Sequence, residues 1–572
     1  MKNKRCVIIM GIILYCFSLH GQNKHLLPDY FRSPVDYLYQ LSGNFCELRE
    51  SHFHAGIDIK PSRKGSKEKI YSIGDGYISR IRVSPGGYGR VIYIDHPDVG
   101  YTSVYAHLDV FYSNIEEQVK QYQMSQESYE VDFLPEPHVF PVKKGDIIGF
   151  MGNTGYSFGK HLHFEIRDTK TEQPVNPLHF GMQVPDSTLP SIISLAFHGL
   201  DSDYNKILDV RMPVGTNVGN IIEVEEPIIL QTHKVGIALQ TFDKSDGTYN
   251  KLGIYGFHMY VDDSLIFSYH LDKVSFDQSR QVIGFYDFQV KKKENKIFTL
   301  CYKYPGNHLE MLKKTGTGII EIFPDKDRYV RIEVEDFNRN KRTIKFFLRK
   351  SEEPPDTIYR PSLKKIFFNE SETIEHKKLT VIFKENSLFR NIGFDVIDLK
   401  EPDRETIYQI HSELEPVKNP IEISIRPDTI VYDKQGKYVI VKMNAKGSKI
   451  NYGGRWKDEK LTTRIREFGK FTIAIDTIGP IIKSINFNKR SGKKTAFRFK
   501  LADNMPVRGE DVEPLKYKVY INDKFVISPY HLRTGILEVP LSNLPAGEHL
   551  LHITAIDHSN NMSEFRGMFI KK

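Results

Sequence analysis

A chain of 572 residues is too long for a single core, and a composition that is 40% hydrophobic and 12% aromatic excludes general disorder. The formal net charge of +8 is mild at this length, so it suits an anionic partner without indicating nucleic acid. We therefore expect three to five packed domains.

Residues 1–21 have the pattern of a secretory signal peptide. Basic residues open the segment, and the apolar stretch at 7–19 is too short to span a bilayer. Cleavage is predicted after Gly21, because that residue is small. No later run is long and apolar enough for a membrane helix, so we expect an exported, soluble protein of the periplasm or cell envelope, or a secreted one.

The four cysteines fall into two pairs with different expectations. Cys6 and Cys16 leave with the signal peptide. Lipid attachment at Cys16 is disfavoured, because bulky Tyr15 stands where such a motif has a small residue. Cys46 and Cys301 lie far apart and neither has zinc-finger spacing, so two buried free thiols are favoured over a disulfide.

Residues 22–184 are expected to form a strand-rich domain that holds the clustered chemistry. Its first motif is "HFHAGIDIK" at 52–60. Side chains alternate between the two faces of a strand, so His54 and Asp58 are predicted to share one face. Gly56 lies between them on that face and carries no side chain, which leaves the gap that a bound ion needs.

Two further predicted strands carry imidazoles with the same alternation. "SVYAHLDV" at 103–110 places His107 opposite its apolar residues, and "HLHFEIR" at 161–167 places His161 and His163 on one face. Three nitrogen and oxygen ligands with one open position are the pattern of a catalytic zinc site. Two imidazoles and one carboxylate are also the ligand set of iron oxygenases, which metal analysis would distinguish.

Residues 111–140 are predicted to be an insertion in this domain. The first half of the insertion is rich in Glu, Gln and Lys and lacks Gly and Pro, which indicates a helix. Its role beside the predicted site is open, with reshaping or covering the cleft as the alternatives. The basic run at 60–69 is interpreted as a solvated loop, and attraction of acidic peptides is the alternative.

Beyond residue 185 the sequence repeats loosely, which predicts β domains at 186–350, 356–476 and 477–572. Each opens with Asp, a hydroxyl residue, a short spacer and Pro, a combination that interrupts regular structure. The first and last also close on alternating apolar residues followed by Asp, three residues and Asn. These closing pairs are Asp336 with Asn340 and Asp557 with Asn561. Short alternating strands with Asp, Asn or Gly turns favour Ig-like β-sandwiches for these two, while the middle domain is β-rich and lacks that close.

Three short patterns in the first domain together resemble a known family. "HxGxD" at 54–58, "YAHL" at 105–108 and "GxHLHFE" at 159–165 occur in this order. They resemble the lysostaphin/LytM-type zinc metallopeptidases of bacterial cell walls, over about residues 36–180. The resemblance implies the duplicated hybrid motif fold. The expected fold class is therefore mainly β, with a LytM-type β-sheet peptidase domain followed by β-sandwich (Ig-like) domains.

The resemblance also assigns roles residue by residue. It implies that His54, Asp58 and His163 bind one Zn²⁺ ion, and that His107 and His161 are catalytic histidines that do not bind the metal. Zinc would polarise the scissile carbonyl and lower the pKa of its water towards ~7. The two free histidines would orient or deprotonate the water and stabilise the oxyanion and the leaving amine.

The expected function is zinc-dependent hydrolysis of the peptide cross-links of bacterial peptidoglycan, whose peptide stems are the expected partners. Glu165, further along the histidine face, is interpreted as a supporting or structural residue. The alternative function is a non-catalytic LytM-like regulator of cell-wall amidases, which is disfavoured because all five site residues are present.

The C-terminal modules are expected to bind glycan or other envelope proteins, or to act as spacers. Neither a nucleic-acid partner nor a transmembrane segment after signal removal is expected. In a Gram-negative envelope the predicted target is the D-Ala–diaminopimelate cross-link, and otherwise glycine-containing bridges.

Overall fold

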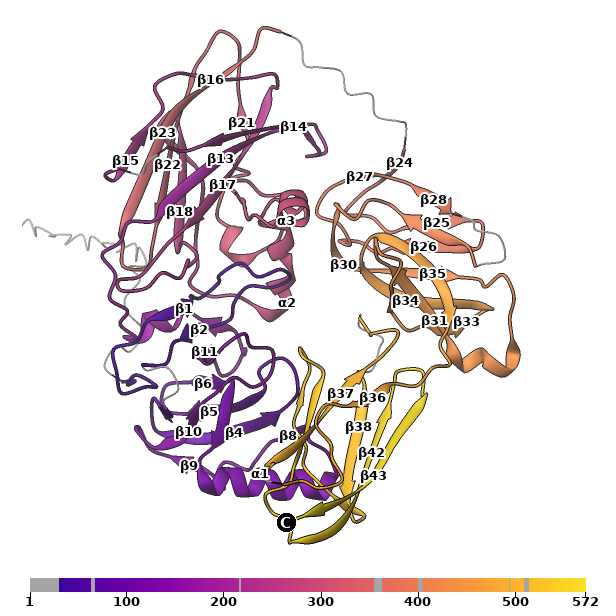
Figure 1. The fold of residues 1–572 in the computed structure, drawn as a ribbon. Helices are drawn as coiled ribbons and strands as arrows, with labels where there is room; N and C mark the ends of the chain where they lie inside the picture. Colours follow the sequence, from indigo (N-terminus) through magenta and orange to yellow (C-terminus); the bar gives the residue numbers. More distant parts are fainter. Residues whose placement is uncertain are drawn as a thin grey trace, which may run out of the picture.

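The computed structural model describes residues 30–62, 67–215, 218–353, 363–399, 405–492, 494–508 and 514–572. The predicted signal peptide, with Gly21 and Cys16, and part of the basic run at 60–69 lie outside these residues. Figure 1 shows the chain passing from an indigo and purple sheet domain through two further β bodies to a yellow sandwich, which returns to lie beside the first domain. The chain is mainly β, which confirms the predicted fold class.

The first body is built on a nine-stranded antiparallel sheet and a smaller three-stranded sheet. The large sheet has the order β1-β2-β11-β6-β5-β4-β8, with β12 beside β11 and β9 beside β4. The small sheet has the order β3-β10-β7. The strands are β1 (Leu41–Gly43), β2 (Ile57–Ile59), β3 (Lys69–Tyr71), β4 (Gly76–Val83), β5 (Arg90–His96), β6 (Tyr101–Ala106), β7 (Leu108–Phe111), β8 (Val131–Phe133), β9 (Pro141–Val142), β10 (Ile147–Met151), β11 (Leu162–Asp168) and β12 (Pro174–Val175).

Strand β11 lies in the middle of the large sheet and is buried on both faces. Leu162, Phe164 and Ile166 point into the apolar core, as their alternation predicts. The opposite face carries the polar side chains of the strand. This central position fixes the histidine face of β11 rigidly, because strands pair with it on both sides.

The predicted insertion contains a helix, as its composition indicates. Helix α1 (Ser113–Gln126) buries Ile115 and Val119, and the chain then forms β8, which pairs with β4 at the edge of the large sheet. A short 3₁₀ helix, η1 (Pro177–Phe180), closes the first body. The insertion is thus part of the packed domain and not a detached loop.

The second body consists of two sheets, with short helices between β19 and β21 in the chain. One sheet has the order β14-β13-β17-β20 with β21 beside β17, and the other β15-β23-β22-β18-β19 with β16 beside β23. The elements are β13 (Ser191–Leu200), β14 (Lys206–Pro213), β15 (Ile221–Glu223), β16 (Ile228–Leu230), β17 (Lys234–Phe242), β18 (Gly256–Val261), β19 (Ser264–His270), α2 (Phe276–Ser279), η2 (Arg280–Gly284), α3 (Phe288–Glu294), β20 (Thr299–Leu300), η3 (Glu310–Leu312), β21 (Ile320–Glu321), β22 (Arg328–Glu335) and β23 (Lys341–Lys350).

The third body has two five-stranded sheets, β25-β26-β30-β34-β33 and β28-β29-β35-β31-β32, and the pair β24-β27. Its elements are β24 (Lys364–Ile366), β25 (Glu372–His376), β26 (Leu379–Phe383), β27 (Ile392–Phe394), β28 (Val396–Leu399), β29 (Ile407–Ile410), β30 (Pro416–Ile425), η4 (Tyr432–Lys437), β31 (Tyr438–Met443), β32 (Lys449–Asn451), β33 (Arg455–Lys457), β34 (Lys460–Glu467) and β35 (Gly469–Ile475).

The last body is a sandwich of two four-stranded antiparallel sheets, β36-β37-β41-β40 and β39-β38-β42-β43. Its core is a separate apolar cluster that includes Phe497, Leu537 and Ile553. The strands are β36 (Ile481–Ser484), β37 (Ala496–Ala502), β38 (Lys516–Ile521), β39 (Lys524–Phe525), β40 (Tyr530–His531), β41 (Ile536–Pro540), β42 (Gly547–Ile556) and β43 (Met562–Lys571).

The first two bodies share one hydrophobic core. A single cluster of buried side chains extends from Phe31 into the second body, where the ring centroids of Phe53 and Phe285 lie 5.8 Å apart. Polar contacts reinforce the junction, because Asn44 donates to the Gly253 carbonyl oxygen at 2.7 Å. The predicted boundary near residue 185 stays a prediction, and we expect the two bodies to depend on each other for stability.

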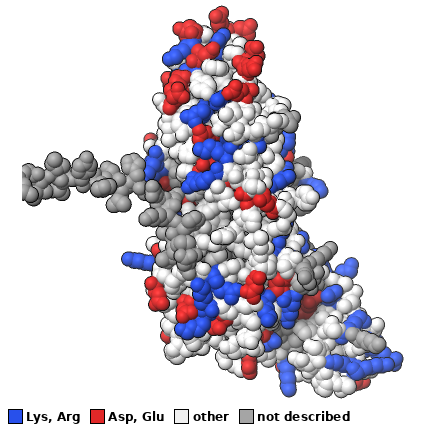
Figure 2. All heavy atoms as spheres, turned by 90° about the vertical axis from the view of Figure 1, so that its left-hand side faces the viewer, with Lys and Arg blue, Asp and Glu red and all other residues white. Residues whose placement is uncertain are grey.

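The cysteines, the surface charges and the lengths of the helices can be compared with what the sequence predicts. Cys46 and Cys301 are buried free thiols, as expected. Figure 2 shows basic and acidic side chains interspersed over one face of the molecule. Within the described residues, no helix is both long enough and apolar enough to cross a membrane.

Candidate metal centre

Three side chains of the first body converge on one point. The Nε2 atom of His54, the Oδ1 atom of Asp58 and the Nδ1 atom of His163 each lie 3.0 Å from the other two. All three residues are buried. The sequence grouped them as ligands, and the structure brings them together in a form that could hold one metal ion.

Adjacent strands position two of the three groups. Asp58 in β2 stands directly opposite His163 in β11. His54 lies before β2, in a segment whose main chain pairs with the preceding loop, since His54 N donates to Glu47 O at 3.0 Å. The prediction of one strand over 52–60 is therefore wrong, because only Ile57–Ile59 pairs as a strand.

The sequence predicts that Gly56 leaves a gap for a bound ion, but in the structure this residue allows a close approach between two main-chain segments. A Cβ atom there would lie 2.3 Å from the carbonyl oxygen of Phe164, which is closer than any side chain can approach. Glycine therefore lets the loop lie against β11 and so brings His54 towards Asp58. It does not provide the space for an ion.

Hydrogen bonds fix which nitrogen of each imidazole faces the centre. His54 donates through Nδ1 to the carbonyl oxygen of Asn44 at 2.8 Å, and His163 donates through Nε2 to Glu165 Oε1 at 2.8 Å. Each bond directs the other ring nitrogen at the centre, where it becomes a ligand once it has lost any proton. Glu165, which the sequence marked as a supporting or structural residue, thus orients His163.

Glu165 is itself held by Tyr88, which lies in none of the quoted motifs, and by Arg167, the last residue of the quoted segment at 161–167. The Tyr88 hydroxyl donates to Glu165 Oε1, and Arg167 donates through Nε to Oε2 at 2.7 Å. Burial alone would raise the pKa of Glu165, but Arg167 and His163 lower it to about 2. Glu165 is therefore a fixed negative charge under the centre.

Arg49 plays the corresponding part for Asp58. It donates through Nη2 to Asp58 Oδ2 at 3.2 Å, which leaves Oδ1 for the centre. Burial would raise the pKa of Asp58, yet the neighbouring His54 charge and the hydrogen bonds from His161 and His163 hold that pKa well below its ordinary value. No motif pointed to Arg49, because it lies outside the alternating segment.

The two remaining histidines flank the triad. His107 lies between β6 and β7 with a φ of +60°, so the predicted strand at 103–110 breaks at this residue. It donates through Nδ1 to the Thr154 carbonyl oxygen at 2.8 Å, and its ring centroid lies 4.8 Å from that of His161. His161 donates through Nδ1 to the Gly159 carbonyl oxygen at 2.8 Å, and its Nε2 is 3.5 Å from Asp58 Oδ1.

The electrostatic surroundings distinguish these two imidazoles. Burial, followed by the charges of His163 and His161, lowers the pKa of His107 to about 3, so this ring is neutral. A neutral His107 that donates through Nδ1 can only accept through Nε2. The Nε2 of His161 faces a carboxylate oxygen, which places this atom to donate a proton.

The centre opens into a cleft of about 1510 Å³. Basic side chains from several segments line it, namely Arg49, Lys60, Arg82 and Lys160, together with the exposed rings of Tyr156 and Phe158. The last sandwich supplies a further wall with Pro514, Leu515, Tyr530 and Leu532. The sequence did not predict this wall, since more than 350 residues separate it from the centre.

The insertion is where the last sandwich docks. Glu127, at the end of α1, accepts hydrogen bonds from Lys518 Nζ and the Tyr520 hydroxyl, both at 2.9 Å. At a second contact of the sandwich with the first body, the Arg533 guanidinium lies 5.1 Å from the centroid of the Phe158 ring. The insertion therefore shapes the cleft indirectly, by holding the sandwich that forms its wall.

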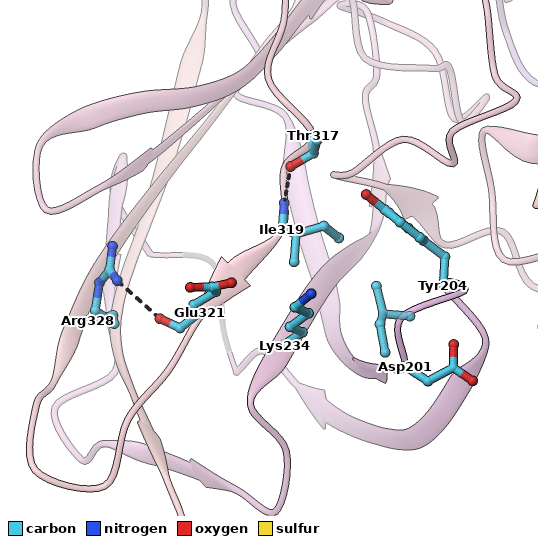
Figure 3. A pocket seen from close by; sticks show the side chains of 8 residues that line it. Asp201, Tyr204, Lys234, Thr317, Ile319, Glu321 and Arg328 are labelled. Atoms are coloured by element: carbon cyan, nitrogen blue, oxygen red, sulfur yellow. Dashed lines mark hydrogen bonds between the residues drawn. The ribbon is translucent and has the colours of Figure 1, made fainter.

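A second pocket, of about 390 Å³, lies in the second body (Figure 3). Lys234 and Tyr204 line it, and Arg328 donates to the Glu321 carbonyl oxygen at 3.1 Å. None of its lining residues is a histidine or cysteine, so it lacks the mixed nitrogen and oxygen ligands of the first centre.

Family comparison covers two parts of the chain. Residues 52–125 and 140–177 match the model of peptidase family M23, and these segments contain all five predicted site residues. The unmatched stretch between them falls within the predicted insertion. Residues 364–476 match the model of a Zu5-like domain, which corresponds to the β-rich middle domain. The resemblance to LytM-type peptidases is thereby confirmed.

Individual relatives cover a minor part of the chain. DD-carboxypeptidase/endopeptidase Mpg of Neisseria meningitidis serogroup B and that of Neisseria gonorrhoeae are each 33% identical over 141 residues, or 25% of this chain. The chain spans about a quarter of the length of these relatives, since the alignment covers 26% of each. A zinc-containing peptidase from Vibrio cholerae is 27% identical, with 27% of this chain and 39% of that chain covered and a TM-score of 0.19.

Proposed function

We propose that the M23-type domain of this chain is a zinc-dependent endopeptidase that hydrolyses the peptide cross-links of bacterial peptidoglycan. The observation that carries the proposal is the convergence of His54, Asp58 and His163 at 3.0 Å separations. The family match and the peptidase relatives support the reaction class. The predicted signal peptide supports a location in the cell envelope.

The donor set fits zinc. Zinc accepts imidazole nitrogen and carboxylate oxygen, and ligands about 2.0 Å from a tetrahedral ion lie about 3.3 Å from each other. The 3.0 Å separations require only a small expansion of the triad. When bound, zinc supplies Lewis-acid activation of the water and of the scissile carbonyl.

The chain's own residues perform the proton transfers. His107 accepts from the attacking water through Nε2, because its Nδ1 is committed to Thr154. His161 donates a hydrogen bond through Nε2 to the oxyanion, and the proton that His107 has taken from the water passes to the leaving amine, so both histidines end in their starting protonation states. Glu165 and Arg49 keep His163 and Asp58 in place, so the reacting groups need no rearrangement.

The cleft favours an acidic peptide. Peptide stems of peptidoglycan carry free carboxylates, which basic side chains that line the cleft can attract. Of the four basic side chains, Arg49 and Lys160 pair with Asp58 and Glu68, so Lys60 and Arg82 are the cations offered to the substrate. Lys60 belongs to the basic run at 60–69, so at least this residue of the run lines the cleft. The exposed rings of Tyr156 and Phe158 offer apolar contact to the rest of the stem.

Digestion of a purified cross-linked muropeptide dimer tests the proposal. The zinc-loaded mature protein should convert the dimer to monomers, and mass spectrometry should show the addition of one water per bond cleaved. An intact dimer after incubation with folded, zinc-loaded protein would reject the peptidase function. Stimulation of a cell-wall amidase by that same inactive protein would favour the regulatory alternative.

The wall formed by the last sandwich leads to a prediction about substrate binding. Leu532 is 50% exposed and lines the cleft, so Leu532→Ala should remove apolar contact with the substrate. A loss of about 1 kcal/mol corresponds to a roughly five-fold rise in KM with little change in kcat. The matched control is Met568→Ala, which truncates a similarly exposed side chain on β43. Equal kcat/KM for both variants would show that the wall does not touch the substrate.

A further inference from the structure

The repeated Asp–x–x–x–Asn close of the second and last bodies has a structural counterpart. Asp336 follows β22 and Asp557 follows β42, and each joins two aspartates from distant parts of its own body. In each group, one carboxylate oxygen from every member lies within 4.8 Å of the others. The two groups, which we call the aspartate triads, are Asp186, Asp243 and Asp336, and Asp476, Asp503 and Asp557.

The two triads are built in the same way. In each, the asparagine that ends the motif donates through its main-chain N–H to Oδ1 of the closing aspartate, and through its side-chain amide to the main-chain oxygen of the opening aspartate. Asn340 N lies 2.9 Å from Asp336 Oδ1, and its side-chain amide nitrogen lies 3.1 Å from Asp186 O. Asn561 N lies 2.8 Å from Asp557 Oδ1, and its side-chain amide nitrogen lies 3.0 Å from Asp476 O. The same pair of hydrogen bonds therefore holds the opening and closing aspartates together in both bodies.

The charge of the triads is not balanced by protein groups. In the part of the chain that the structure describes, no Lys, Arg or His forms an ion pair with any of the six aspartates. By contrast, the cluster of His258, His270 and Glu335 has Arg339 at 2.7 Å from Glu335. Three like charges within one buried group repel one another unless a cation or protons compensate them.

Asp243 shows this imbalance most clearly. The residue is only 4% exposed, and its Oδ1 atom has no hydrogen-bond partner among the described residues. Burial, followed by the charges of Asp186 and Asp336, raises the pKa of Asp243 to about 8. A buried carboxylate oxygen without a partner is unfavourable, and a bound cation would satisfy it.

The ligand chemistry indicates which cation. The triads offer carboxylate oxygens without nitrogen or sulfur, which suits a hard divalent ion and not zinc. Calcium accepts six to eight oxygens in irregular geometry, so nearby main-chain oxygens and water could complete the shell. We propose that each aspartate triad binds one Ca²⁺ ion.

The positions of the triads suggest what the ions do. Asp186 lies between η1 and β13, and Asp476 lies between β35 and β36, so each triad contains an aspartate of a connecting segment. The other two members stand at the ends of strands within the following body. A bound ion would therefore join the connecting segment to the end of the sandwich, and would stiffen the junction with the preceding body.

Calorimetric titration of the full-length, zinc-loaded protein with CaCl₂ tests the proposal. We expect two ions per chain, with dissociation constants on the order of 10⁻⁴ M as in extracellular calcium modules, and a higher thermal midpoint. Magnesium should bind more weakly, because it demands a regular octahedral shell. Asp58→Asn should still bind two calcium ions, which separates these sites from the metal centre.

Isosteric variants assign the sites. Asp243→Asn and Asp503→Asn should each remove one calcium ion, and the double variant should remove both. Controls are Asp263→Asn and Asp523→Asn, exposed hairpin aspartates of the same two bodies at positive φ, where asparagine is tolerated. If a triad variant fails to fold, the half-buried Asp186→Asn replaces it for the first site.

Two results would overturn the proposal. One is a wild-type protein that shows neither binding heat nor a shift in thermal midpoint up to roughly 5 mM CaCl₂, which lies above the range of such modules. The other is calcium binding that persists unchanged in the folded double variant, because the ions would then occupy other groups.

Discussion

Replacement of any one of the three converging side chains should remove the metal and almost all activity. The variants are His54→Ala, Asp58→Asn and His163→Ala, because each removes one of the three predicted ligands. We expect zinc content to fall to background in elemental analysis, and cleavage of the muropeptide dimer to fall by about 10³-fold or more. The loss follows because two remaining ligands hold the ion weakly.

The control for this series is His138→Ala, which truncates an exposed histidine of the insertion. It should retain one zinc per chain and full turnover. Circular dichroism spectra would establish that all variants are folded. Stoichiometric zinc in the three folded triad variants would show that the metal, if any, binds elsewhere.

The second large effect is expected from the two histidines that flank the triad. His107→Asn and His161→Ala should retain zinc and lose roughly 10²-fold or more in kcat, because each removes a proton-transfer partner. Asparagine is chosen at position 107 since it tolerates the positive φ of this residue. Zinc analysis and kcat on the dimer are measured on the same preparations.

Zinc retention separates this result from the triad series. A variant at 107 or 161 that binds zinc and cleaves the dimer at the wild-type rate would have no part in the proton transfers. Loss of zinc from the folded His161 variant would instead make this residue a ligand, although its nitrogen is not one of the three grouped ligand atoms that lie within 4.8 Å of one another.

The sequence pointed to five residues that the fold brings close together, but not to how the fold positions them. Alternation correctly places His163 in β11 beside Asp58 in β2, because both residues lie in paired strands. It fails for His54 and His107, which lie outside the strands, where loop hydrogen bonds and a positive φ decide the side-chain direction. Periodicity describes regular strands and carries no information on such positions.

Long-range features were also beyond sequence reasoning. The wall at Leu532 depends on the docking of Lys518 on Glu127, a contact between residues that are far apart in the chain. The Asp–x–x–x–Asn motif was visible, yet its partners Asp243 and Asp503 have no motif of their own. Only folding brings Asp243 and Asp503 close to the other aspartates of their triads.

The most direct test of the central claim is zinc titration of the metal-free protein during cleavage of the cross-linked dimer. We expect no cleavage without metal, a rise in rate that is linear in added zinc, and a plateau at one zinc per chain. A chelator should then abolish the activity, and fresh zinc should restore it. Full activity of the metal-free protein, or no cleavage at any zinc concentration, would show that this chain is not a zinc-dependent endopeptidase.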